Sequence, residues 1–290
     1  MTDRSVLAFP DVARLRRRFQ QPNRRAVDRA SISDPLFLHR KVGEELVERL
    51  QWLRCPPRRV LDIAVGGGGV SSALAQQFPS ANVVQSDLAS FSSNAGGARS
   101  VGHERVAACP DQLPFANASQ DHVVANLVLP WFEPSQMFQS IHRVLVPGGG
   151  FSFSTLGPDT LVELREAFGQ ADEYPHVHDF IDMHDLGDTL GVSGFSEPVL
   201  DVQRLVLTYS TLGEVARDLR ALQFTNLHPG RSKGLLGRRA HQRLIKAYET
   251  NRRDDGRLPV TVEIVYGFAF TGTPSAGGSN PESEIAVTWY

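Results

Sequence analysis

Cysteine is scarce in this chain of 290 residues, which has only Cys55 and Cys109. Two cysteines are too few for a disulfide framework, so we expect a reducing compartment, the cytoplasm. No apolar run approaches the roughly 18–20 residues that a membrane-spanning helix needs. The net charge is only −2, so no overall field favours nucleic acid or a membrane surface. What is present, 41% apolar residues over this length, suits one large domain or one domain with a cap.

The N-terminus also lacks the apolar core of a secretory signal. It is rich in arginine instead, with seven arginines within residues 14–29. An arginine-rich start can mark an organelle transit peptide, but Asp3, Asp11 and Asp28 do not suit a presequence, which is poor in acids. The composition favours a solvated basic helix, and we interpret residues 1–35 as a loosely packed basic N-terminal arm.

Four consecutive glycines, residues 66–69, follow a short apolar run that contains Asp62. Glycine accepts positive φ and lets backbone N–H groups approach a ligand. A glycine run alone could be a flexible surface turn, but Asp87 ends the next apolar run, about 20 residues on, where an acid typically holds a ribose diol. No Lys-Ser or Lys-Thr pair follows the glycines, so a triphosphate-binding loop is not expected. The pattern predicts a nucleotide-binding α/β unit whose ligand has a ribose but no phosphate.

The stretch Val60–Asp62, with Gly66 and Gly68, resembles the first motif of the class I methyltransferases that use S-adenosylmethionine (SAM), Val-Leu-Asp-x-Gly-x-Gly-x-Gly. Ala64 stands where the motif has its first glycine. The turn Leu145–Gly149 matches the Leu-x-Pro-Gly-Gly sequence that precedes strand five in that class. The resemblance implies an α/β fold with a seven-stranded Rossmann-like sheet, helices on both faces, a small helical cap, and SAM as the cofactor.

The resemblance also implies a set of cofactor-binding positions. They are Asp62, Ala64, Gly66, Gly68, Asp87, Cys109 and Asn126. The class has an acid near the adenine amine, three residues before Leu-Pro-Phe; here that place falls on Cys109, and Asp111 is displaced from it by two residues. The Ala64 methyl group would weaken cofactor binding or be absorbed by a small backbone shift.

Periodicity and turn residues predict the elements in chain order. We expect helices over about 36–53, 70–78, 134–145, 159–170, 182–193, 211–223 and 237–251, and strands over about 58–64, 82–87, 104–108, 120–127, 151–155, 199–208 and 260–270. Residues 90–100 are ambiguous between helix and loop. The methyltransferase domain then spans 36–270, with the helical cap at about 209–255, and residues 271–290 form a disordered tail.

The second half of the chain narrows the family. Phe153–Arg165, Met183–Asp188, Gly234–Arg238 and Asp255–Thr261 resemble the BioC-type malonyl-acyl-carrier-protein O-methyltransferases. The resemblance implies methylation of the free carboxylate of a malonyl thioester on acyl carrier protein, early in the pimeloyl steps of biotin biosynthesis. A mitochondrial complex I assembly factor that hydroxylates an arginine is similar over the same blocks. A non-catalytic scaffold on this fold is the third alternative, motivated by the two departures in the cofactor motifs.

Such a reaction needs recognition of a carboxylate rather than a base, because a carboxylate is already ionised at pH 7. Arginine recognises carboxylates best, through a bidentate fork. The candidates are Arg220, Arg231 and Arg165, and the first two flank the Thr225-Asn226 loop of the expected cap. Trp131, in the loop after strand four, is expected to line the substrate site or to pack in the core.

Residues 231–246 are strongly basic. They contain Arg231, Lys233, Arg238, Arg239, Arg243 and Lys246, with no acid. Helical spacing places three of these cations on one stripe and apolar residues on another. This is either a solvated amphipathic helix or a docking face for an acidic partner such as acyl carrier protein. Nucleic acid is not expected, because no aromatic residues interleave with the cations, and no histidine spacing indicates a metal site.

Overall fold

The computed structural model describes residues 9–20, 36–53, 55–88, 104–222, 224 and 226–272. Most of the predicted N-terminal arm, the ambiguous stretch 90–100, Thr225 and the predicted tail beyond residue 272 lie outside the described residues. Within the arm, α1 (Val12–Gln20) is helical, but Leu15 and Phe19 are buried. This helix therefore packs against the domain along one face and is not solvated all round.

Seven strands form one sheet, in the order β3-β2-β1-β4-β5-β7-β6. They are β1 (Arg59–Ala64), β2 (Asn82–Asp87), β3 (Glu104–Ala107), β4 (Gln120–Asn126), β5 (Leu145–Leu156), β6 (Phe195–Tyr209) and β7 (Leu258–Thr271). Strands β1 to β5 pair in parallel, whereas β7 is antiparallel to both β5 and β6. The predicted seven-stranded Rossmann-like α/β fold is confirmed, and the sheet is mixed.

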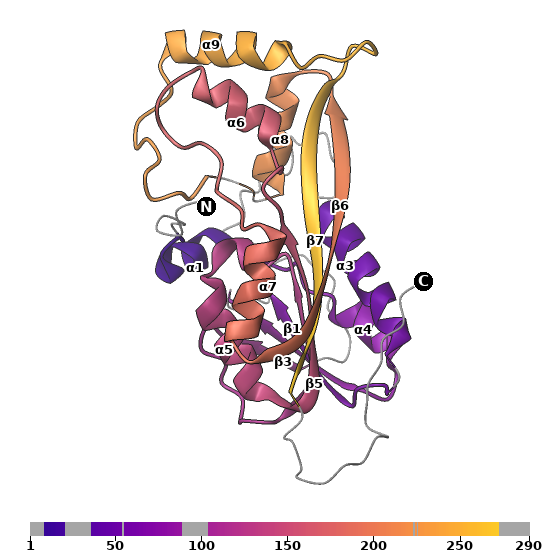
Figure 1. Ribbon diagram of the computed structural model, residues 1–290. Helices are drawn as coiled ribbons and strands as arrows, with labels where there is room; N and C mark the ends of the chain where they lie inside the picture. The colour runs from indigo at the N-terminus through magenta and orange to yellow at the C-terminus, as the bar shows by residue number, and fades with distance from the viewer. Residues whose placement is uncertain are drawn as a thin grey trace.

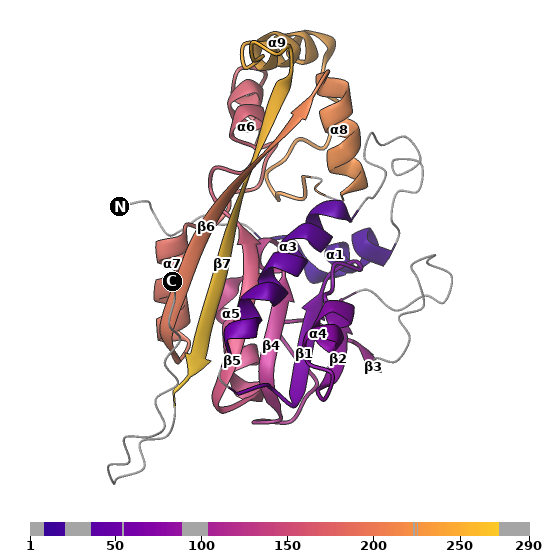
Figure 2. The same cartoon turned by 90° about the vertical axis from the view of Figure 1, so that its right-hand side faces the viewer.

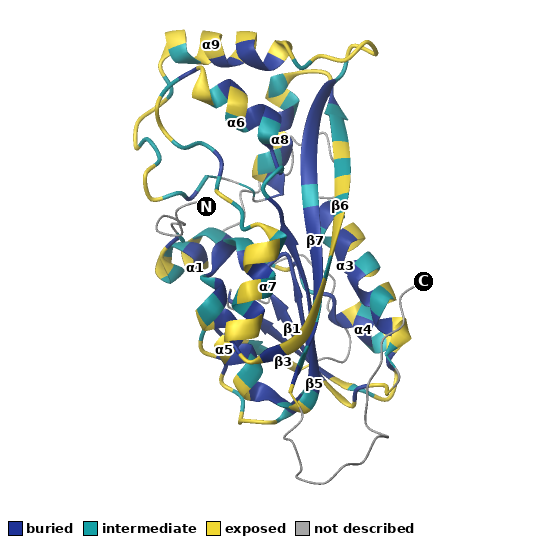
Figure 3. Cartoon of the chain, viewed as in Figure 1, coloured by how far each residue is buried: buried dark blue, intermediate teal, exposed yellow. Residues whose placement is uncertain are grey.

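Helices cover both faces of the sheet. On the faces lie α3 (Phe37–Arg49), α4 (Ser71–Gln77), α5 (Pro134–Val144) and α7 (Met183–Val192). Three more helices, α6 (Val162–Gly169), α8 (Leu212–Ala221) and α9 (Arg238–Glu249), lie beyond the end of the sheet. Figures 1 and 2 show α3 and α4 on one face and α5 and α7 on the other. Apolar residues of β1 and β4 are buried on both faces, as expected for central parallel strands. β7 is buried along its length, whereas much of the edge strand β6 is exposed (Figure 3).

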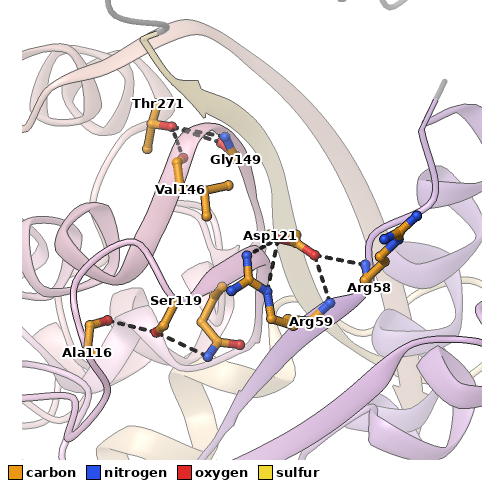
Figure 4. Close-up of polar contacts among 9 residues, drawn as sticks. Arg58, Arg59, Ala116, Ser119, Asp121, Val146, Gly149 and Thr271 are labelled. Atoms are coloured by element: carbon orange, nitrogen blue, oxygen red, sulfur yellow. Dashed lines mark hydrogen bonds and ion pairs between the residues drawn. The ribbon is translucent and has the colours of Figure 1, made fainter.

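Strand β5 begins earlier than the sequence predicts. The Pro-Gly-Gly-Gly segment expected as a turn is part of the strand, and the register against β4 shifts between Gln120 and His122. Figure 4 shows how this end of the sheet is held: the Thr271 hydroxyl donates to the Val146 carbonyl at 2.7 Å and accepts from the Gly149 N–H at 3.0 Å. Nearby, the Asp121 carboxylate accepts from the backbone N–H of Arg59 at 2.9 Å and pairs with its guanidinium. These contacts fix the end of the sheet at which the parallel strands begin.

A helical cap stands beyond the carboxyl ends of the parallel strands. α6, α8 and α9 gather there in both views (Figures 1 and 2). The strands β6 and β7 continue past the last pair between β5 and β7, Leu156 with Ile264, and reach the cap as a two-stranded ribbon. Helix α9 packs through its apolar stripe, and the buried Tyr248 donates to the Pro259 carbonyl at 2.8 Å. Helix α6, which precedes the range expected for the cap, packs against α9.

Candidate active site

The glycine loop is organised by the buried carboxylate of Asp62. One oxygen, Oδ2, accepts the backbone N–H of Val70 at 2.9 Å and the hydroxyl of Ser71 at 2.5 Å. Burial raises the pKa of Asp62 to about 6, against hydrogen bonds that lower it. Its other oxygen, Oδ1, is buried without a hydrogen-bond partner. Asp62 therefore ties the end of the loop to the first turn of α4 and keeps one acceptor unused.

Asp87 reaches across from β2 to the same loop. Its two oxygens accept the backbone N–H groups of Gly66, at 3.1 Å, and Gly67, at 3.0 Å. Both glycines have positive φ, +67° and +90°, which side chains other than glycine rarely adopt. The acid that follows the glycines by about 20 residues thus contacts the glycine loop directly. Its predicted role in holding a ribose diol stays a prediction.

Ala64 turns its methyl group toward Gly69. A side-chain carbon at Gly69 would lie 3.1 Å from the Ala64 Cβ, 2.7 Å from Asp62 Oδ2 and 2.0 Å from Gln85 Nε2. Ala64 itself is fully buried. The methyl group of Ala64 therefore fits because Gly69, which faces it, has no side chain.

Asn126 closes the loop from the end of β4. Its side-chain amide donates to the Gly68 carbonyl at 3.0 Å and to the His39 carbonyl at 2.8 Å. Its oxygen accepts the Ser154 hydroxyl at 2.8 Å. Its side chain therefore joins the loop to α3 and β5 and positions the loop, and the prediction that Asn126 binds the cofactor stays a prediction.

Asp111 lies beside Cys109, the residue at the position where the motif has its acid. A tight turn, with the Gln112 N–H donating to the Cys109 carbonyl at 3.0 Å, brings Asp111 Oδ2 within 3.9 Å of the Cys109 sulfur. Burial raises the pKa of both side chains. Asp111 Oδ1 is buried without a hydrogen-bond partner. The sequence prediction placed this position of the site on Cys109; the structure adds the neighbouring acid, which the resemblance alone did not assign.

These features fit an adenosyl cofactor. The unpaired acceptor of Asp111 suits an amine donor, and Asp87 stands at the end of β2, where the sequence predicts an acid for a ribose diol. Among the described residues, no group of three or more His, Cys, Asp or Glu side chains could hold a metal ion. None of the described helices is long and apolar enough to span a membrane.

The sequence analysis missed the cover over this loop. The Phe19 ring of α1 lies against Gly66, where a side-chain carbon would be 2.5 Å from Phe19 Cδ1. The ring of His39, from α3, lies against Gly68 in the same way, at 2.6 Å. The only signal in the sequence is the pair Leu15 and Phe19, four residues apart in a basic segment, because this spacing gives a helix one apolar stripe.

An apolar hollow lies between this cover and the cap. Its lining residues include Trp131, Thr160, His178, Phe224 and Asn226. The volume open to a water-sized probe is only about 30 Å³, about enough for one water molecule. The prediction that Trp131 lines a ligand site stays a prediction, and its ring does face the hollow.

The three candidate arginines lie in different surroundings. Arg165 donates to the carbonyls of Pro158, at 2.8 Å, and His178, at 3.1 Å, so its guanidinium holds together the loops around the hollow. Arg220 is exposed on α8, and Arg231 is half-buried and donates to the His228 carbonyl at 3.4 Å. Burial, and next to it the charge of Arg231, lower the pKa of Arg14 in α1.

Comparisons with known proteins agree with this geometry. Residues 61–153 match the family model described as "Methyltransferase domain". A malonyl-[acyl-carrier protein] O-methyltransferase of Laribacter hongkongensis is 41% identical over 274 residues, which cover 90% of each chain. Proteins of the same name from Gallionella capsiferriformans and Legionella pneumophila are 41% and 38% identical and align with 82% and 87% of this chain.

Solved structures share the fold. A putative methyltransferase from Bacillus halodurans aligns with a TM-score of 0.52 at 18% identity and covers 79% of this chain and 99% of its own. The YcgJ protein from Bacillus subtilis aligns with the same TM-score at 12% identity, over 81% of this chain and 100% of its own. At these identities, the likeness concerns the fold alone.

Proposed function

Because the chain belongs to the malonyl-[acyl-carrier protein] O-methyltransferases, we propose that it methylates the free carboxylate of a malonyl thioester on acyl carrier protein, with SAM as the methyl donor. The observation that carries the proposal is the extent of the similarity. The relatives align over the cofactor half and the cap alike, up to 90% of the chain. The reaction belongs to the early pimeloyl steps of biotin biosynthesis.

The proposed mechanism asks little acid–base chemistry of the protein. When bound, SAM supplies an electrophilic methyl group on a sulfonium leaving group. The malonyl carboxylate is ionised at pH 7, so no side chain has to remove a proton. The protein's part is to hold the two groups in line and to exclude water. The apolar walls of the hollow, which include Leu156, Leu161 and Phe180, support this role.

Binding of the cofactor and the carboxylate would fall to different elements. We assign the adenine amine to Asp111, the ribose hydroxyls to Asp87, and the loop's shape to Asp62 and Asn126. For the substrate carboxylate we favour Arg231, since Arg165 already donates to backbone carbonyls. Arg220 is a weaker candidate because it is exposed on α8.

The docking face for the carrier protein was predicted over Arg231–Lys246. This range consists of two parts, the end of the connection from α8 to α9 and the helix α9 itself. Helix α9 carries Arg239 and Arg243 at the far end of the cap, and Arg243 donates to the Ala171 carbonyl. The connection from α8 to α9 descends toward α1 (Figure 1). We favour Arg231, on this connection, and Arg14, on α1, as the part that an acidic carrier protein contacts.

The direct test is the intact mass of malonyl-acyl carrier protein after incubation with this protein and SAM. We expect a gain of one methyl group, and no gain from acyl carrier protein that lacks the malonyl group. Absence of the gain, while a known enzyme methylates the same sample, would contradict the substrate assignment and favour modification of a protein arginine.

Two charge reversals test the docking site. Arg14→Glu should raise the KM for malonyl-acyl carrier protein, because it replaces a cation of the proposed docking site with an acid, while kcat changes little. Arg239→Glu, at the far end of the cap, serves as the matched control. A larger effect of Arg239→Glu would return the docking site to α9.

Arg231→Ala should lower turnover while SAM affinity stays intact, and unchanged kinetics would remove Arg231 from the site.

A further inference from the structure

Trp131 lies between the glycine loop and the hollow, with a ring on each side. On one side it meets Phe19 edge to face, with ring centroids 5.5 Å apart. On the other side it meets His178, with centroids 5.7 Å apart, and both of these residues line the hollow. Because Phe19 itself lies against Gly66, these contacts make a continuous aromatic path from the loop to the hollow.

The backbone that carries Trp131 is held firmly. Leu127, just after β4, has φ of +53°, which is uncommon for a residue other than glycine. Its N–H donates to both the carbonyl and the hydroxyl of Ser154, each at 3.0 Å. The next turn closes with the Trp131 N–H on the Val128 carbonyl at 3.1 Å. Such a conformation persists where the surroundings fix it, and here it fixes the position of the indole ring.

The chemistry of the donor explains what such a ring pair can do. The aromatic path lies between the glycine loop and the hollow. SAM carries a positive charge on sulfur, and its demethylated product is a neutral thioether. Aromatic faces attract cations, most strongly when the contact is shielded from water. Phe19 and Trp131 are only 7% and 5% exposed.

We propose that Phe19 and Trp131 together bind the sulfonium of SAM through cation–π contact and so discriminate the cofactor from its demethylated product. The proposal deepens the function given above and rests on it only in that SAM is the methyl donor. Its consequence is that the product leaves more readily, since the charge that the rings favour disappears with the methyl group. A cation–π contact of ordinary strength gives about a three- to thirty-fold preference.

The test is titration calorimetry of the full chain with three ligands. SAM carries the sulfonium, sinefungin carries an amine cation in its place, and S-adenosylhomocysteine is the neutral thioether. We expect the wild-type protein to prefer the two cations. In Phe19→Leu and Trp131→Leu, affinity for both cations should fall about three- to thirty-fold, with little change for the neutral ligand. Equal weakening of all three ligands would overturn the proposal and leave the rings a packing role.

A conservative variant guards against a fault in folding. Trp131→Phe keeps an aromatic face in a smaller side chain, so it should retain most of the preference that Trp131→Leu loses. Equal loss in both variants would contradict the proposal. The titrations use no acyl substrate. Preference for SAM without methylation of malonyl-acyl carrier protein would therefore contradict only the substrate assignment, and methylation without any preference would contradict only the aromatic contact.

Discussion

The side-chain amide of Asn126 donates a hydrogen bond to the backbone carbonyl of Gly68, across 3.0 Å. This bond joins the end of one parallel strand to the glycine loop of its neighbour, and a second bond from the same amide reaches the His39 carbonyl. Asn126 is buried, so water cannot replace this donor. The shape of the glycine loop therefore depends on the Asn126 side chain.

Asn126→Ala should therefore weaken both the fold and the cofactor site. Removal of the amide leaves two carbonyls without this donor, which costs about 1–3 kcal/mol of unfolding free energy. We expect SAM affinity to fall roughly ten-fold through the distorted loop. Urea unfolding and calorimetry measure the two effects, with the exposed Asn117→Ala as the control. Unchanged SAM affinity in a destabilised Asn126→Ala protein would show that the loop keeps its shape without this bond.

Ala64→Gly should leave cofactor affinity nearly unchanged, although it restores the glycine of the motif. The methyl group points to Gly69 and not to the N–H groups of Gly66 and Gly67. Glycine in a strand costs about 0.5–1 kcal/mol of unfolding free energy. Gly69→Ala should be far worse, because its methyl group would meet Gln85 and Asp62. A large gain of SAM affinity in Ala64→Gly would contradict this account.

Asp111→Ala should lower SAM affinity by about ten-fold, while Cys109→Ala changes it little. The reason is the unpaired, buried Oδ1 of Asp111, which suits the adenine amine, whereas a thiol is a weak acceptor. A SAM analogue with inosine in place of adenosine gives the sharper measurement. The wild-type protein should prefer the adenine form, and Asp111→Ala should lose that preference. If Cys109→Ala loses it instead, the original assignment to Cys109 is right.

His122 should make the fold less stable in mild acid. Burial lowers its pKa from 6.5 to about 4. Between these values the unfolded chain binds the proton and the folded chain does not, so the free energy of unfolding falls as pH falls from about 6.5 to about 4. The full effect is at most about 3 kcal/mol. Unfolding at several pH values should show a flatter dependence for His122→Gln than for the wild type.

The exposed His184→Gln is the control for this measurement and should keep the wild-type slope. Asp62 acts in the opposite direction, since its raised pKa gives stability that is lost as pH rises from about 4 to about 6. The comparison must therefore be between variant and wild type at each pH. An unchanged slope in His122→Gln would show that His122 titrates alike in the folded and unfolded chains.

The sequence was most informative where one local pattern decides the structure. The glycine run between Asp62 and Asp87 predicted the strand, loop and helix unit, and the hydrogen bonds from the loop to Asp87 are an addition of the structure. The strands themselves follow from apolar runs bounded by turns. The antiparallel direction of β7 was not predicted, since periodicity carries no information about strand direction.

Contacts between distant segments were the ones that sequence patterns could not supply. Nothing local indicates that Phe19 meets Trp131, 112 positions later. The basic stretch around α9 was read as one face because its cations are adjacent in sequence. The structure separates Arg231 from Arg243, because the chain changes direction at the start of α9.

The ribbon of β6 and β7 has a consequence for how this enzyme can diversify. Tyr209 and Leu258 are paired neighbours, and all of α8, α9 and their connection lies between them in the chain. This part of the cap is thus a single insertion whose two ends already meet, so its length and sequence can change without altering the register of the sheet. Helices α8 and α9 can thus vary together as one unit while the glycine loop, which lies outside this insertion, is unchanged.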